Sequence, residues 1–425
     1  MRKILILIVL ALLPLAVAAP AEASPQARFG IQDDAWLVYG PGTLDERLDT
    51  LDRLGVDVVR WTIRWDQVAK QRPANPRLAD DPAYDWSFSD DVLAGLRSRG
   101  IGAVVTLLGT PRWANGGRAW QVAPLRGADF ANFAAAASRR YPWVRDWTVW
   151  NEPNQRRWLS PVSARTYVVR LLNPAYGALK GVNRSNRVAG GVTAPRGNAG
   201  GMSPVAFIRA MRAAHARLDA YAHHPYPTRP RTETPTSGGC SHCTTITMAT
   251  LDRLLSEVKR AWGDKRIWLT EYGYQTSPHD RLLGVPAATQ ARYMAEASRK
   301  VYAAPRVDML VHFLVRDDRL LAGWQSGVFT AAGLAKPSYV AFRLPLAQSS
   351  RRGTRTVLWG QVRPRTGRQA YRLRAFQGGR WRWVGSTRQT NARGAFSVAV
   401  TAGRGAKFQL WSPRDRAFSR IVVVR

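Results

Sequence analysis

The sequence alternates short apolar runs with amphipathic helical patterns eight times between Phe29 and about Leu346, and this alternation is its most restrictive feature. Such an alternation predicts parallel strands that are joined by helices. The run at 101–108 is almost wholly apolar, as expected for a parallel strand that is covered on both faces. The predicted strands lie at 29–33, 56–61, 101–108, 147–150, 187–192, 218–223, 266–270 and 307–313.

Residues that start and stop helices separate these runs. Thr43 and Glu46 have the spacing of a capping box, and Gly55 is placed to end the same helix. Ser203-Pro204 predicts another helix start, because proline is well tolerated in the first helical turn. Further helical patterns lie at about 89–100, 129–140, 163–181, 251–262, 286–303 and 338–342.

Eight strand–helix pairs predict a (β/α)8 TIM barrel, a fold that takes roughly 250 residues or more. We place this domain at 28–347. The main alternative is a doubly wound open sheet. It is disfavoured because no glycine-rich phosphate loop follows the first strand.

The pattern changes at Arg351, where short runs that alternate polar with apolar residues are separated by turn residues such as Gly378-Gly379. This pattern predicts a small all-β, sandwich-like accessory domain at 351–425. The segment contains eighteen Lys or Arg and one acidic residue, Asp415, in a chain whose formal net charge is +34. The charge predicts salt-dependent attraction to polyanions, such as an anionic cell-envelope polymer, although a bias toward arginine codons explains it equally well.

Two further expectations concern this basic segment. It should be dispensable for catalysis by the barrel, provided that it does not pack on the barrel. Helix–turn–helix patterns and RNA-binding signatures are absent from the sequence, so no specific nucleic-acid partner is expected.

The N-terminus has the three parts of a secretory signal peptide. Met1-Arg2-Lys3 is positively charged, an apolar run extends from Ile4 to Ala19, and Ala21-Glu22-Ala23 is a small-x-small cleavage pattern. We therefore predict a signal peptide at 1–23 and a secreted protein whose mature chain has no transmembrane span. The apolar run is short for a transmembrane helix, which disfavours the alternative of an uncleaved anchor.

Cys240 and Cys243 are the two cysteines of the chain, and they lie in one loop. A disulfide between them is the default expectation in an exported protein. A thioredoxin-like redox pair is disfavoured because no strand precedes the motif. A zinc site is disfavoured because the two cysteines and His242 lack a fourth ligand at regular spacing.

A glutamate follows directly on two of the predicted strands. Glu152 comes after the run at 147–150, and Glu271 comes after the run at 266–270. The active site of a TIM barrel lies at the carboxyl ends of its strands. The alternative for each glutamate is a solvated loop position or an arginine partner, since an unpaired carboxylate beside an apolar core is costly. Two facing carboxylates are what glycoside hydrolysis requires, and this chemistry needs no metal or cofactor.

The motifs around these glutamates resemble those of clan A glycoside hydrolases, the group that contains the cellulase-type family 5 and the xylosidase-type family 39. Trp150-Asn151-Glu152-Pro153 is similar to the clan's strand-four motif, and Leu269-Thr270-Glu271-Tyr272-Gly273 is similar to its strand-seven motif. The resemblance covers about 29–343. It implies a retaining β-glycosidase in which Glu152 is the acid/base and Glu271 the nucleophile.

Two further positions match the clan pattern, and one departs from it. Arg60 matches the strand-two arginine, and His224-Pro225-Tyr226 matches the strand-six His-x-Tyr, whose tyrosine steadies the nucleophile. Clan members often have a tryptophan at the end of strand eight, where this chain has Phe313. Trp324 follows a few residues later and is the candidate for that role.

The remaining candidate substrate-binding residues have specific expected roles. Asn151 should hydrogen-bond the sugar 2-hydroxyl, with loop capping as the alternative. Arg60 should lie beneath Glu271 and keep it ionised. His224 orients this network or is a satisfied core histidine. Trp113 and Trp158 stack on sugar rings or pack in the core, and Asp33, at the end of the first strand, should bind a hydroxyl group.

These residues predict the hydrolysis of β-O-glycosidic bonds in a carbohydrate substrate by double displacement. The alternative is a non-catalytic secreted protein that binds carbohydrate or the cell envelope through a TIM-barrel scaffold. The intact glutamate pair and Asn151 favour the enzyme.

Overall fold

The computed structural model describes residues 24, 26–278, 280–363 and 367–425. The predicted signal peptide at 1–23 lies outside the described residues. Within the described ranges, no helix has both the length and the apolar character needed to cross a membrane.

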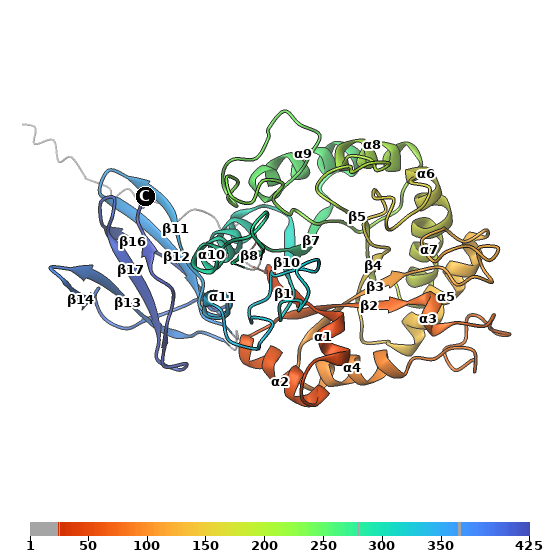
Figure 1. Ribbon diagram of the computed structural model, residues 1–425, viewed down its shortest axis with the longest axis horizontal. Helices are drawn as coiled ribbons and strands as arrows, with labels where there is room; N and C mark the ends of the chain where they lie inside the picture. The colour runs from red at the N-terminus through yellow and green to blue at the C-terminus, as the bar shows by residue number, and fades with distance from the viewer. Residues whose placement is uncertain (1–23, 25, 279, 364–366) are drawn as a thin grey trace, which may run out of the picture.

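Eight parallel strands close into a barrel, which confirms the predicted fold (Figure 1). Their order around the barrel is β1-β10-β7-β6-β5-β4-β3-β2, and β1 closes it by pairing with both β10 and β2. Each strand overlaps one of the eight predicted apolar runs. The strands are β1 (Arg28–Gln32), β2 (Val58–Arg64), β3 (Gly102–Leu108), β4 (Asp146–Val149), β5 (Arg187–Thr193), β6 (Ala220–His223), β7 (Arg266–Tyr272) and β10 (Val307–Phe313).

Helices surround the barrel, and the predicted capping signals act where expected. The helix α2 (Leu44–Leu54) begins with the Thr43–Glu46 capping box and ends at Gly55, whose φ of 74° is left-handed. Two short helices, α1 (Asp34–Tyr39) and α3 (Trp65–Val68), follow β1 and β2 directly and were not predicted. The others are α4 (Ser87–Ser98), α5 (Gly127–Arg140), α6 (Ala164–Tyr167), α7 (Asn173–Val182), α8 (Pro204–Ala213), α9 (Leu251–Trp262), α10 (Ala287–Ala303) and α11 (Pro337–Arg343).

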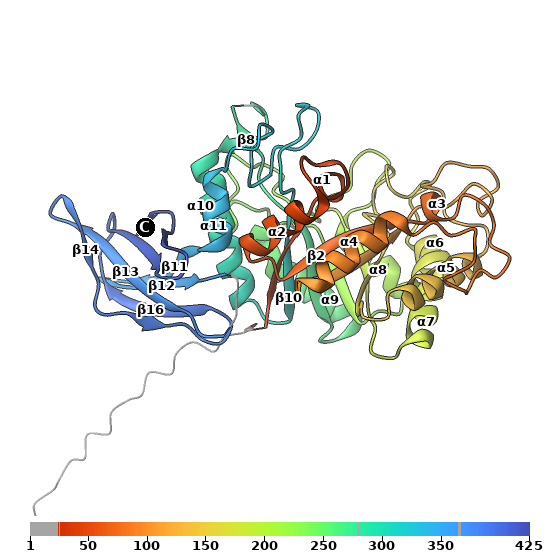
Figure 2. The ribbon, with the colours of Figure 1, turned by 90° about the horizontal axis from the view of Figure 1, so that it is seen from below.

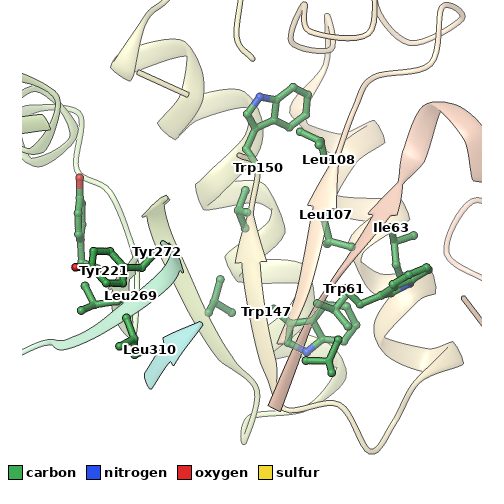
Figure 3. Packing of buried hydrophobic residues seen from close by; sticks show 14 of the residues in the cluster. Trp61, Ile63, Leu107, Leu108, Trp147, Trp150, Tyr221, Leu269, Tyr272 and Leu310 are labelled. Carbon is green, nitrogen blue, oxygen red and sulfur yellow. The ribbon is translucent and has the colours of Figure 1, made fainter. Parts of the chain in front are cut away.

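The strands have one apolar layer outside the barrel and another inside it, and the charged side chain of Arg60 lies inside. Val59 and Ile63 of β2 belong to the layer that the strands share with the surrounding helices. Val58 belongs to a separate cluster with Trp268 and Met309, which fills the barrel interior. Because residues two apart on a strand share a face, Arg60 lies on the same side as Val58, inside the barrel. Figure 3 shows buried side chains of the outer layer, including Trp61 and Trp147.

The chain after the barrel forms two antiparallel sheets. One has the order β11-β12-β16; the other has the order β14-β13-β17-β18, with β15 and β19 added to it. Leu346 and Leu358 from the first sheet share a buried cluster with Leu373 and Leu410 from the second. The strands are β11 (Leu346–Arg352), β12 (Arg355–Gln361), β13 (Ala370–Gln377), β14 (Arg380–Trp383), β15 (Arg388–Gln389), β16 (Ala395–Thr401), β17 (Lys407–Ser412), β18 (Ala417–Phe418) and β19 (Val422–Val423). The first strand begins before Arg351, the predicted start of this region.

This β-region packs on the barrel next to α10 and α11 (Figures 1 and 2). Arg363 is fully buried, and its guanidinium lies 3.9 Å from the ring of Phe29 in β1 and 4.9 Å from that of Phe342 in α11. Trp359 of β12 contacts Tyr302 of α10, with ring centroids 5.4 Å apart. The basic segment was expected to be dispensable provided that it does not pack on the barrel. These contacts show that it does pack there, so its removal would expose apolar surface of the barrel.

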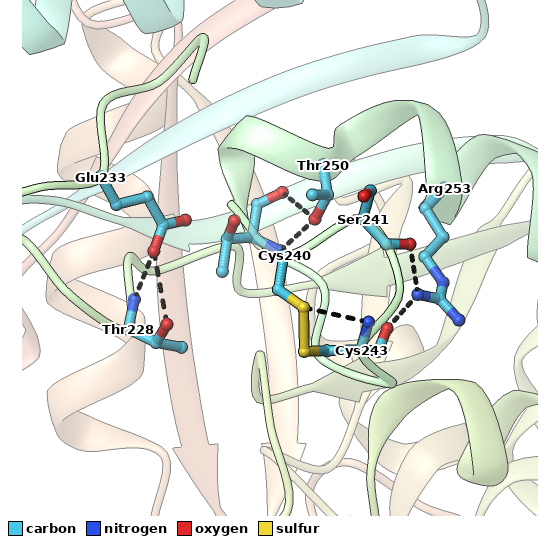
Figure 4. Close-up of a disulfide and its surroundings, with 8 residues drawn as sticks. Thr228, Glu233, Cys240, Ser241, Cys243, Thr250 and Arg253 are labelled. Atoms are coloured by element: carbon cyan, nitrogen blue, oxygen red, sulfur yellow. Dashed lines mark hydrogen bonds between the residues drawn. A yellow bond between two sulfur atoms is a disulfide. The ribbon is translucent and has the colours of Figure 1, made fainter. Parts of the chain in front are cut away.

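The predicted Cys240–Cys243 disulfide is confirmed (Figure 4). It lies in the long loop between β6 and α9. Arg253 of α9 donates hydrogen bonds to the backbone carbonyls of Ser241 and Cys243, which ties the loop to the helix.

We predict that Trp359→Ala destabilises the whole protein. The indole is 2 % exposed, and replacing a buried tryptophan by alanine costs about 3–5 kcal/mol. Chemical denaturation followed by circular dichroism should show a lower midpoint for one shared transition. Trp383→Ala is the matched control, because Trp383 is 45 % exposed, and its effect should be much smaller. Equal effects of the two variants, or a separate transition in which only the β-region shifts, would contradict this prediction.

Candidate active site

A cleft of about 1180 Å³ opens at the carboxyl ends of the barrel strands. Its lining combines strand-end residues with residues of the loops that follow the strands. Both glutamates line it, together with five other predicted substrate-binding residues: Asp33, Asn151, Trp158, Tyr226 and Trp324.

A strained turn presents Glu152 to this cleft. The strand β4 ends at Val149, and both Trp150 and Glu152 have left-handed backbone conformations, with φ of 71° and 38°. Such conformations are costly for residues other than glycine, typically about 1–3 kcal/mol each. The fully buried Trp150 indole holds the turn by donating a hydrogen bond to the Trp158 carbonyl at 2.8 Å, and the Glu152 amide donates to the Val192 carbonyl at 2.9 Å.

The two glutamates face each other across the strand ends. One carboxylate oxygen of Glu152, one of Glu271 and a ring nitrogen of His224 all lie within 4.8 Å of one another. Glu271 belongs to β7 and is 9 % exposed. The strand-four and strand-seven motifs therefore meet, as expected from their places in the barrel.

Glu271 is held by two donors. Arg60 Nη1 donates to its Oε1 at 2.5 Å, and the Tyr226 hydroxyl donates to its Oε2 at 3.1 Å. Arg60 lies on β2 with a side chain that is 1 % exposed. The guanidinium therefore lies against the Glu271 carboxylate, at the position expected for Arg60.

Arg60 also binds Asn151, which precedes Glu152. Arg60 Nη2 donates to the Asn151 side-chain oxygen at 2.8 Å. The amide group of an asparagine that accepts in this way keeps both of its N–H donors for other partners. Asn151 lines the cleft, so these donors are suited to a hydroxyl group of a bound molecule.

Glu152 has a different environment from Glu271. Burial raises the pKa of its carboxyl from 4.5 to about 7, and the nearby Arg60 charge opposes this shift. Its Oε1 lies 2.9 Å from His224 Nδ1. Two carboxyl groups whose surroundings differ in this way are suited to one acidic and one anionic role.

His224 is a neutral partner that tolerates either state of Glu152. Burial lowers its pKa to about 3, and its Nε2 lies 3.1 Å from the Thr270 hydroxyl. A neutral imidazole has one donor and one acceptor nitrogen. Nδ1 can therefore accept from protonated Glu152 while Nε2 donates to Thr270, and the other tautomer reverses both bonds. The neighbouring His223 is the satisfied core histidine, bound to Thr193 and to the Ile246 carbonyl.

The predicted aromatic residues divide between the cleft and the core. Trp158 and Trp324 line the cleft, and the Trp324 ring lies 4.9 Å from that of Tyr226. Trp113 does not line it. Its ring packs edge-on against Trp65, and its indole N–H donates to the Ala69 carbonyl at 2.8 Å. For Trp113, these contacts favour packing, one of the two roles expected from the sequence.

Asp33 lines the cleft, and its carboxylate accepts hydrogen bonds from backbone amides. It caps α1 by accepting from the Trp36 amide at 3.0 Å, and its other oxygen accepts from the amides of Val315 and Arg316. Both carboxylate oxygens thus have backbone partners, and a further contact of Asp33 with a substrate hydroxyl stays a prediction.

The next residue, Asp34, was missed. It lines the cleft; burial raises the pKa of its carboxyl group, and hydrogen bonding by Thr62 opposes this shift. Gln32 was also missed; its side-chain oxygen accepts from Arg60 at 2.6 Å. Polar character at the end of the first strand is the sequence signal for both residues.

Glu152, His224 and Glu271 are also the one group of potential metal ligands found among the described residues. The surroundings favour another use. The Arg60 guanidinium already pairs with Glu271 at 2.5 Å, so a metal cation at this position would face a like charge. The group fits proton transfer and nucleophilic attack better than cation binding.

Several solved glycoside hydrolases have a similar structure. A family 39 glycoside hydrolase from the gut symbiont Bacteroides cellulosilyticus is 17 % identical, with a TM-score of 0.58 over 90 % of this chain and 82 % of that chain. A glucosidase from Croceicoccus marinus is 14 % identical, with a TM-score of 0.60 over 96 % and 97 %. The catalytic domain of the GH30 xylanase C from Talaromyces cellulolyticus is 12 % identical, with a TM-score of 0.51 over 95 % and 98 %.

The sequence itself matches no protein-family model and no curated protein. At identities this low, the structural likeness establishes the fold alone. The fold implied by the resemblance to clan A is therefore confirmed.

We predict that one glutamate carboxyl titrates with a midpoint near pH 7. In ¹³C NMR of protein labelled at glutamate carboxyls, this signal should be absent from Glu152→Gln. Arg60→Met should move the midpoint upward, because the Arg60 charge lowers the pKa of Glu152. A Glu152 signal that titrates near 4.5 would contradict the described environment.

Proposed function

We propose that this protein is a retaining β-glycoside hydrolase in which Glu271 is the nucleophile and Glu152 the acid/base. The observation that carries the proposal is the pair of facing carboxylates with unlike surroundings. Arg60 and Tyr226 bind Glu271, whereas burial raises the pKa of Glu152 to about 7.

The distance between the two glutamates is compatible with retention. Retaining enzymes have carboxyl groups about 5–5.5 Å apart, whereas inverting enzymes need about 6.5–9.5 Å to admit a water molecule. Here one oxygen of each carboxyl group lies within 4.8 Å of the other.

The first step forms a glycosyl–enzyme intermediate. A Glu271 oxygen attacks the anomeric carbon while Glu152 gives its proton to the leaving glycosidic oxygen, whose bond to that carbon breaks. Arg60 and Tyr226 hold the Glu271 carboxylate in place before the attack. The amide donors of Asn151 bind the sugar 2-hydroxyl, a contact that strengthens in the transition state.

The second step returns the enzyme to its starting state. Glu152, now ionised, takes a proton from water as the water oxygen attacks the anomeric carbon, and the bond to Glu271 breaks. His224 stays neutral and remains within hydrogen-bonding distance of Glu152 and Thr270 throughout.

Three further residues complete the proposed substrate site. Trp158 and Trp324 offer aromatic surface in the cleft, which suits the apolar faces of sugar rings. Asp34 lines the same cleft, and its carboxyl group is a further candidate to bind a sugar hydroxyl.

We also propose that the protein is exported and acts on its carbohydrate substrate outside the cell. The N-terminal pattern of a signal peptide supports this proposal, as does the Cys240–Cys243 disulfide, because disulfides persist mainly in oxidising compartments.

We predict opposite azide products for variants of the two glutamates. Glu271→Ala should lose turnover, and azide in the vacated space should give the α-glycosyl azide. Glu152→Ala should lose about 10²- to 10⁴-fold on substrates with poor leaving groups, the usual contribution of general acid–base catalysis. On an activated aryl β-glycoside it should accumulate the intermediate, and azide should convert this to the β-glycosyl azide. NMR of the products identifies the anomers.

The control is Glu257→Ala. Glu257 lies on α9, pairs with Arg209 and Arg260, and does not line the cleft. It should retain turnover. If the two variants gave the opposite azide anomers, the roles of Glu152 and Glu271 would have to be exchanged. If the parent protein bound sugar but hydrolysed no aryl β-glycoside, the non-catalytic alternative would be favoured.

A further inference from the structure

The outer face of the second sheet in the β-region concentrates aromatic side chains. Tyr371, Leu373 and Ala375 of β13 are buried in the sandwich, so the alternating residues between and after them point the other way. Strand register then places five aromatic residues on this outer face: Phe376, Trp381, Trp383, Trp411 and Phe418.

Three cations lie among these rings. The Arg372 guanidinium is 4.0 Å from the Trp383 ring, and that of Arg374 is 3.4 Å from the Phe418 ring. Lys407 Nζ lies 5.5 Å from the Phe376 ring. The Arg374 guanidinium also donates to the Gln409 side-chain oxygen, from Nε at 3.0 Å and from Nη2 at 2.6 Å, so its Nη1 keeps the donors that remain for a ligand. We call these cations and the five aromatic residues the aromatic–basic face.

Among the residues that the structure describes, no acidic side chain forms an ion pair with these three cations. Asp415 is the one Asp or Glu from position 351 onward, and it pairs with Arg343 at the end of α11 at 3.0 Å. Arg372 also has a buried Nε atom without a hydrogen-bond acceptor among the described residues. The cations of the face are therefore free to attract an anion.

The face also exposes apolar area that the fold does not need. Phe376 and Trp383 are 39 % and 45 % exposed, although the sandwich has its own buried core. Exposed aromatic surface beside unpaired cations is typical of an interaction site.

We propose that the aromatic–basic face binds an acidic polysaccharide, a sugar polymer that carries carboxylate groups. The planar fork of a guanidinium matches a carboxylate, and indole rings pack against sugar rings. Arg372 and Arg374 are alternate residues of one strand, about 7 Å apart, so they present a row of charges to a repeating anion.

A single-stranded nucleic acid is the competing polyanion, because its bases also stack on aromatic side chains. The test below compares the two polymers directly. The proposed binding site is separate from the catalytic cleft and does not depend on the proposed reaction.

The test measures the binding of polygalacturonate to the full-length protein by isothermal titration calorimetry. Arg372→Gln/Arg374→Gln should weaken binding about tenfold or more, because charge-assisted hydrogen bonds are lost. Trp383→Ala should also weaken it. The matched control is Arg352→Gln/Arg355→Gln, which removes the same charge from a cross-strand pair in the β11–β12 hairpin of the other sheet and should change Kd less than about twofold.

Circular dichroism establishes that each variant is folded. Trp383→Ala is included because an exposed side chain can be replaced with little effect on folding. Equal weakening by the two double variants would mean that general charge attraction, not this face, binds the polymer. Undetectable binding, or unchanged binding by Trp383→Ala, would also overturn the proposal. Tighter binding of a neutral glucan or of oligo(dT) would overturn the choice of an acidic polysaccharide.

Discussion

The buried guanidinium of Arg60 organises the catalytic end of the barrel. It donates hydrogen bonds to Gln32 on β1, Thr106 on β3, Asn151 after β4 and Glu271 on β7. A charge with a side-chain exposure of 1 % is stable only where its donors are satisfied, so these partners are energetically linked. One side chain thereby fixes the orientation of both the proposed nucleophile and the asparagine beside the proposed acid/base.

The different environments of the two glutamates follow from this geometry. Arg60 donates a hydrogen bond to Glu271, whereas it acts on Glu152 through its charge alone. Glu152 instead contacts the neutral His224. Burial then dominates at Glu152 and raises its pKa to about 7, where a carboxyl group can both give and take a proton near neutral pH.

The sequence predicts the parts of this structure that depend on local patterns. Apolar runs located all eight barrel strands, and the two glutamates were found because each follows such a run. Tertiary properties were harder to predict. The partners of Asp33 and Asp34 depend on where β1 ends and α1 begins, and the packing of Trp113 depends on Trp65, which is distant in sequence. The burial of Arg363 could not be predicted from local sequence either, because it depends on Phe29, which is distant in the chain.

The most direct test of the account is the anomeric configuration of the first product. An aryl β-glycoside that the enzyme accepts is hydrolysed in an NMR tube, and the sugar is observed before mutarotation. Double displacement through Glu271 predicts that the β-anomer appears first and the α-anomer follows. An α-anomer that appears first would show single displacement by water, and it would contradict the role given to Glu271.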